Sequence, residues 1–186
     1  MIPFINMRRS LLSLLLLSLL FGSASAKPIR VLFLGHESEH HNSNKFYPML
    51  AKGLGRDAIY FDYVTTVEGA LGDAAYLNKF DALLLYANHG RIKPGQWRNL
   101  KAFVEGGGGF VPVHCASWCF GNEPGFDQLV GGRFASHKTG IFTAKVVDPK
   151  HPAMAGVKEF EAWDETYKHR NHNKKDRQVL MVREVA

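Results

Sequence analysis

The segment Gly106-Gly-Gly-Gly-Phe-Val-Pro-Val-His-Cys-Ala-Ser-Trp-Cys119 decides how the chain folds. Its glycines follow a predicted helix over Pro94–Glu105, which has proline in its first turn. The apolar run Phe110–Val113 predicts a buried strand, and His114 and Cys115 stand where that strand turns into the next helix. Because ligands of open parallel sheets bind at the carboxyl ends of the strands, this pair is placed for chemistry.

The same alternation of apolar strands and helices precedes this segment. The other predicted elements are strands over Ile29–Gly35, Ile59–Val64 and Phe80–Tyr86 and a helix over Asn44–Leu54. Continuous apolar runs are typical of strands that helices cover on both faces. The order of elements therefore predicts a single α/β domain with a mostly parallel, doubly wound sheet.

The alternation of predicted strands and helices ends in the C-terminal part of the chain. Gly131–Lys138 is predicted to be a glycine-hinged loop and Asp148–Pro152 a turn, because two prolines exclude regular structure there. Further strands are expected over Gly140–Val147, Phe160–His169 and Gln178–Val182. The chain stops just after the last apolar run, which leaves open that the domain is truncated at its C-terminus.

The first 26 residues predict a secretory signal peptide. Arg8 and Arg9 precede the apolar run Leu11–Phe21, and Ala24-Ser-Ala26 has the pattern of a cleavage site. The apolar run is too short for a comfortable membrane span. We therefore expect residues 27–186 to be exported to the periplasm or the outside of the cell, with no stable membrane anchor after cleavage.

The charge of the chain excludes one class of partner. The 23 Lys and Arg residues outnumber the 17 Asp and Glu residues, but they are scattered apart from the cluster Lys168–Arg177. The interleaving of basic and aromatic residues that binds single-stranded nucleic acid is missing. We expect no nucleic-acid partner.

Imidazoles and carboxylates gather at several predicted strand ends and in the later loops. They are His36, His89, His114, His137, Asp164, Glu165 and His169. A single histidine at a strand end is usually a hydrogen-bonded core or rim residue. Three at three strand ends of one crevice indicate a functional site.

Two kinds of chemistry fit this set. His36, His114, His137 and Glu165 could bind one divalent transition metal with an open position, although no HExxH or CxxC-type signature is present. Without a metal, His114 and His137 could transfer protons while Glu165 or Asp164 orients an imidazole. The sequence leaves both alternatives open.

Five short motifs occur in the order and spacing of the ThuA-like, trehalose-utilisation family, which the chain resembles over residues 29–183. The motifs are Gly107-Gly-Gly-Phe-Val-Pro-Val-His114, Leu129-Val-Gly-Gly-Arg-Phe134, Ser136-His137, Val147-Asp-Pro-Lys-His-Pro152 and Asp164-Glu-Thr-Tyr167. The resemblance implies a flavodoxin-like three-layer α/β sandwich similar to class I glutamine amidotransferases. It also implies a role in disaccharide or keto-sugar metabolism in bacteria, and domains that run somewhat further at the C-terminus.

The chain departs from the amidotransferases at the strand-to-helix elbow. Aligned there, His114 takes the place of the nucleophilic cysteine and Cys115 follows it, and no His-x-Glu pair occurs after that position. We therefore do not expect a glutaminase. Cys115 could be a reactive thiol at a helix N-terminus, and a disulfide to Cys119 is conceivable, but one helical turn rarely permits that geometry. We favour two buried, apolar cysteines.

A sugar ligand fits the side chains near these groups. Trp118 and Tyr167 could stack on a sugar ring, and His36, His89 and His169 could bind its hydroxyls, whereas the plain alternative is that the aromatic residues fill the core. We expect an enzyme that acts on a small carbohydrate, as a hydrolase, lyase or isomerase. The alternative is a non-catalytic carbohydrate-binding module of a larger exported protein. A thiol enzyme that uses Cys115 is the third hypothesis.

Overall fold

A parallel sheet forms the centre of the molecule, for which a computed structural model describes residues 27–185; the predicted signal peptide lies outside these residues. The strands run in the order β2-β1-β3-β4, all parallel. They are β1 (Ile29–Leu34), β2 (Ile59–Val64), β3 (Ala82–Leu85) and β4 (Gly109–Pro112). All four lie where apolar runs predicted them. The order matches the first four strands of flavodoxin-like sheets, so ligands are expected near the carboxyl ends of β1 and β3.

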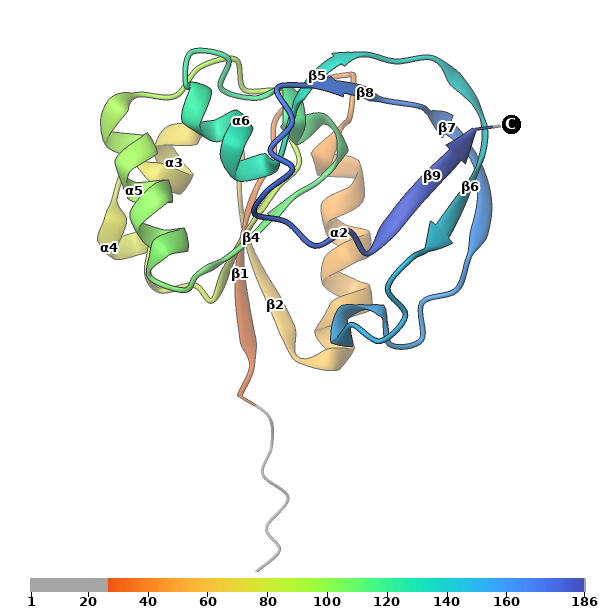
Figure 1. Cartoon of the computed structure of the whole chain (residues 1–186). Helices are drawn as coiled ribbons and strands as arrows, with labels where there is room; N and C mark the ends of the chain where they lie inside the picture. Colours follow the sequence, from red (N-terminus) through yellow and green to blue (C-terminus); the bar gives the residue numbers. More distant parts are fainter. Residues whose placement is uncertain (1–26, 186) are drawn as a thin grey trace, which may run out of the picture.

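Helices lie on both sides of this sheet (Figure 1), with α2 on one side and the remaining helices on the other. They are α2 (Ser43–Leu54), α3 (Val67–Leu71), α4 (Ala74–Leu77), α5 (Pro94–Glu105) and α6 (Pro124–Val130). From β1 the chain moves outward to β2 and then back past β1 to β3. Right-handed crossovers in these opposite directions place helices on opposite faces. The molecule is thus a mixed α/β fold.

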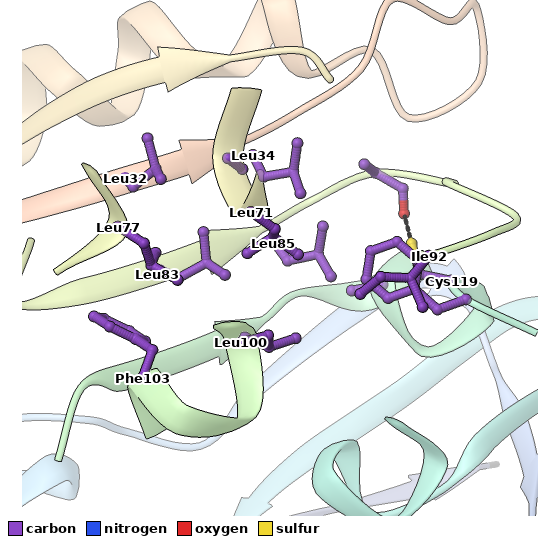
Figure 2. Packing of buried hydrophobic residues seen from close by; sticks show 14 of the residues in the cluster. Leu32, Leu34, Leu71, Leu77, Leu83, Leu85, Ile92, Leu100, Phe103 and Cys119 are labelled. Carbon is purple, nitrogen blue, oxygen red and sulfur yellow. Dashed lines mark hydrogen bonds between the residues drawn. The ribbon is translucent and has the colours of Figure 1, made fainter. Parts of the chain in front are cut away.

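The main core lies between the sheet and α3, α4 and α5. Figure 2 shows Leu32 and Leu34 of β1 beside Leu83 and Leu85 of β3, with helix residues such as Leu100 packed against them. All of these side chains are almost completely buried. Each contributes roughly 1.5–3 kcal/mol relative to an exposed side chain.

The opposite face of the sheet is covered only in part. Since side chains alternate along a strand, Phe33 points away from the leucine core and packs against Tyr47 of α2 and Tyr63 of β2. On the β4 side, Val111 and Val113 remain 47% and 37% exposed. The uncovered part of this face becomes one wall of the cavity described below.

Antiparallel strands form the C-terminal part of the structure, on the same side of the parallel sheet as α2 (Figure 1). One sheet has the order β7-β6-β9 and a second pairs β5 with β8. The strands are β5 (Arg133–Ser136), β6 (Thr139–Val146), β7 (Phe160–Glu165), β8 (Lys168–Arg170) and β9 (Met181–Val185). Among residues 27–185, no helix is long and apolar enough to cross a membrane.

Three local predictions are wrong. The expected loop Gly131–Lys138 contains strand β5, and the expected strand Phe160–His169 is two strands in different sheets. Thr166 and Tyr167 lie between these strands, and the backbone N–H and hydroxyl of Thr166 both donate to the carbonyl of Lys138. The helix expected after His114 is a short 3-10 helix, His114–Trp118, and Pro124 begins α6.

Candidate functional site

Four segments that are distant in the sequence meet at the carboxyl ends of the parallel strands. His41 comes from the loop after β1 and Asn88 from the loop after β3. His114 is the second residue after the end of β4. Glu165 is the last residue of β7 and reaches this edge from the antiparallel part. The site therefore lies where open α/β sheets bind ligands.

His114 lies at the centre of this group. Its Nε2 lies 2.9 Å from Glu165 Oε2, and its ring stacks on Tyr167 with centroids 4.3 Å apart. The ring of His41 meets it edge-on at 4.8 Å. The backbone of His114 has a φ of +48°, a left-handed conformation that is uncommon for a residue with a side chain. The tight turn after β4 thus projects the imidazole above the sheet.

Glu165 connects two imidazoles. Its Oε1 lies 3.4 Å from Nε2 of His137, while Oε2 contacts His114. Its backbone N–H donates to Asp164 Oδ1 over 2.7 Å, which fixes the end of β7. Within residues 27–185, no lysine or arginine forms an ion pair with Glu165. The basic side chains that contact this partly buried carboxylate are therefore both histidines.

His36 supports the loop that carries His41. Its Nε2 donates to the carbonyl of His41 over 2.9 Å, and its Nδ1 accepts from the N–H of Asn88 over 3.2 Å. Both ring nitrogens are thus engaged with the backbone, and the side chain does not reach Glu165. His41 is the residue that sequence reasoning missed. The loop after β1 carries His36, His40 and His41, and its sequence does not indicate which histidine faces the crevice.

Two cavities meet at this group. The first, of about 530 Å³, has an apolar wall that includes Phe46, Met49 and Val113 and a polar end at His114 and Asp164. The second, of about 260 Å³, is smaller and richer in polar and aromatic groups. Its lining residues are His41, Asn88, Cys115, Trp118, Phe134, His137, Glu165 and Tyr167. His41 and Glu165 line both cavities, so a ligand in either one can reach them.

Asn88 lines the second cavity. Its side-chain oxygen is buried and has no hydrogen-bond partner within the described part of the chain. A buried acceptor without a partner costs roughly 1–3 kcal/mol, which a ligand hydroxyl or a water molecule can recover.

The three histidines expected to bind sugar hydroxyls, His36, His89 and His169, line neither cavity. His89 Nε2 donates to the carbonyl of Gly35 over 2.9 Å, and burial lowers the pKa of His89. His169 Nε2 lies 3.2 Å from the Ser117 hydroxyl. Burial is the main cause that lowers the pKa of His169, and the nearby His172 lowers it further. The first contact joins the segments that follow β1 and β3, and the second joins β8 to the 3-10 helix after β4.

Both cysteines are free and buried. Cys119 Sγ donates to the carbonyl of Ala87 over 2.9 Å (Figure 2). Burial raises the pKa of each thiol to about 12, which suppresses the nucleophilic thiolate at neutral pH. The favoured interpretation as apolar core residues agrees with this environment.

The chain is similar to known proteins in sequence and in structure. A family model described as ThuA, trehalose utilisation, matches residues 30–185. A putative ThuA-like protein from Bacteroides uniformis superimposes with a TM-score of 0.67 and 20% identity, over 84% of this chain and 69% of that chain. A putative ThuA-like protein from Parabacteroides merdae superimposes with a TM-score of 0.69 and 20% identity, over 84% of this chain and 68% of that chain. At this identity the two structures show a shared fold. No curated protein matches the sequence significantly.

Proposed function

The chain belongs to the ThuA (trehalose utilisation) family, and from that membership we propose that it is an exported enzyme acting on a sugar or keto-sugar derivative. One observation carries the proposal. His114 and Glu165 form a 2.9 Å pair at the junction of two cavities, at the carboxyl edge of a parallel sheet.

The pair is suited to proton transfer. When Nε2 of His114 donates to Glu165, the lone pair on Nδ1 is free to accept a proton from a sugar hydroxyl or from a carbon beside a keto group. The imidazolium that results is stabilised by the carboxylate beside it. His137, on the other carboxylate oxygen, is a second proton carrier. Proton removal from the sugar begins a lyase or isomerase reaction, and the same base acting on a water molecule would serve a hydrolase.

The second cavity supplies the groups that a sugar needs. Trp118 and Tyr167 offer aromatic faces to the apolar side of a ring, and the unpartnered oxygen of Asn88 can accept from a hydroxyl. The first cavity, with its apolar wall, has room for a second ring or an aglycone. A small glycoside lying across the junction would present its linkage to His114 and Glu165.

We further propose that the domain is a flavodoxin-like three-layer sandwich and that the chain is exported. The strand order and the helices on both faces support a flavodoxin-like three-layer sandwich. The sequence of residues 1–26, with Arg8, Arg9 and the leucine-rich run, supports export by a cleaved signal peptide to the periplasm or beyond.

The test compares Glu165→Gln with Glu161→Gln, which changes an exposed carboxylate on the same strand outside both cavities. Trehalose, related disaccharides and their keto derivatives are screened for binding and turnover. We expect Glu165→Gln to lower turnover about 100-fold or more and to leave sugar affinity within about tenfold, because general acid–base catalysis contributes this much. Glu161→Gln should behave as the wild type. Equal turnover in both variants would refute the role of the pair.

A non-catalytic carbohydrate-binding module is the second candidate. The aromatic lining and the free acceptor of the second cavity favour it, since they bind a sugar without requiring a reaction. Sugar binding without any turnover by the wild type would select this alternative. The thiol enzyme is disfavoured by the raised pKa of Cys115, and full turnover by a Cys115→Ser variant would end that hypothesis.

A further inference from the structure

We infer that His41, His114 and Glu165 form the binding site of one divalent transition metal ion. One nitrogen from each histidine and one carboxylate oxygen lie within 4.8 Å of one another. This set replaces the one expected from the sequence, because His36 uses both ring nitrogens elsewhere. The existence of the site is independent of the proposed function; its part in sugar chemistry rests on that function.

The spacing suits a single ion. Zinc binds imidazole nitrogen and carboxylate oxygen at roughly 2.0–2.2 Å, so two ligands of a tetrahedral ion lie about 3.4 Å apart. His114 Nε2 and Glu165 Oε2, at 2.9 Å, are already close to this separation. The other separations, of up to 4.8 Å, would have to shorten by side-chain rotation for all three groups to bind one ion.

The backbone holds both imidazoles in uncommon conformations. The φ angles of His41 and His114 are +56° and +48°, in the left-handed region that residues with side chains seldom adopt. Each such residue costs on the order of 1 kcal/mol or more and persists only where the surroundings impose it. Two of the three ligands thus lie on strained turns. His36 holds the first turn through the carbonyl of His41, and the Tyr167 ring orients His114.

The charges around the site favour a cation. Glu165 is partly buried and, within residues 27–185, has no lysine or arginine partner. A divalent ion would balance the carboxylate, with two neutral imidazoles completing the set. Two histidines and one glutamate are a ligand set of catalytic zinc sites, and imidazole also suits iron, nickel and copper.

Such an ion would face both cavities, since His41 and Glu165 line each of them. Its open position would take a hydroxyl or keto oxygen of a sugar at the junction, which the ion would polarise as a Lewis acid. With Nε2 of His114 bound to the ion, this imidazole would no longer donate to Glu165 or act as the base, and His137, beside the other oxygen of Glu165, would accept the proton instead.

The test uses the full chain dialysed against zinc and analysed for bound metal. We expect about one zinc per chain, and a dissociation constant raised more than about 100-fold in His41→Ala, His114→Ala and Glu165→Gln. His40→Ala, at the exposed neighbour of His41, is the matched control and should keep wild-type affinity. A folded wild type that retains no zinc, or equal affinity in His41→Ala, overturns the inference.

Cobalt substitution keeps the inference testable if a variant fails to fold. The wild type loaded with Co²⁺ should show absorption of a low-coordinate nitrogen and oxygen site. An intense thiolate-to-cobalt band would instead place the ion on Cys115 and overturn the assignment. If protein freed of metal by a chelator still turns over a sugar, the metal takes no part in the reaction. Zinc bound without any sugar bound or turned over would refute the proposed function and leave the metal site in place.

Discussion

His114 and Glu165 lie 51 residues apart in the sequence and meet through a 2.9 Å contact between Nε2 and Oε2. The histidine follows β4 of the parallel sheet, and the glutamate ends β7 of the antiparallel sheet. The antiparallel strands that follow the alternating strands and helices therefore supply the carboxylate of the site. Both acids that line the two cavities, Asp164 and Glu165, come from this part of the fold.

Strain at His114 should appear in stability measurements. His114→Gly and His114→Ala remove the same imidazole, but glycine adopts a φ of +48° without the cost that alanine incurs. We expect His114→Gly to be more stable than His114→Ala by about 1 kcal/mol in the free energy of unfolding, measured with urea. Equal stability, or a more stable alanine variant, would contradict a strained turn at this position.

The strands of the parallel half were predictable from their apolar runs, although one face of the sheet is covered only in part near β4. β1 and β3 read as continuous apolar runs, and α5 has proline at its start and glycine after its end. The short helices α3 and α4 were missed, although Thr66 and Asp73 cap them with side-chain oxygens. That capping signal was present in the sequence.

The C-terminal part and half of the site depend on contacts that no local pattern encodes. β5 was missed because it pairs only with β8, more than thirty positions away. His114, His137 and Glu165 were selected from their strand ends and loops, and the structure brings them together. His41 was passed over for His36, because the left-handed turn that aims it arises from the tertiary fold.

The two thiols should resist alkylation in the native protein. Burial raises the pKa of Cys115 and of Cys119 to about 12, so both remain protonated through pH 8. We expect iodoacetamide at pH 8 to label neither cysteine within minutes, and to label both once urea has unfolded the chain. Rapid labelling of one native thiol, located by mass spectrometry, would show that it is accessible as a thiolate.

Stability should decline in mildly acidic solution. Burial lowers the pKa of His89 in the folded state below its ordinary value near 6.5, so the unfolded chain binds more protons as the pH falls. The stabilisation is complete above about pH 6.5 and is lost as the pH drops through the folded pKa. His41 and His169, whose pKa values are also lowered, add to this loss.

His89→Gln tests this dependence, since glutamine retains a donor for the carbonyl of Gly35 but does not titrate. The slope of unfolding free energy against pH between 5 and 6.5 should decrease by up to about 1.4 kcal/mol per pH unit. His40→Gln, at an exposed histidine, should leave the slope unchanged. Identical slopes in wild type and His89→Gln would show that His89 is not a source of the loss.

Two tryptophans provide a matched comparison for sugar binding. Trp118 lines the second cavity and is 42% exposed, whereas Trp163 is 70% exposed on β7 and lines neither cavity. Each tryptophan can stack on a sugar, but only Trp118 can do so beside Asn88, Glu165 and Tyr167. We expect Trp118→Ala to weaken sugar binding about tenfold or more, which is 1.4 kcal/mol or more, and Trp163→Ala to change it less than about twofold. Calorimetric titration of both variants with one disaccharide measures this difference. A larger loss in Trp163→Ala would move the sugar from the second cavity to the outer face of the antiparallel sheet.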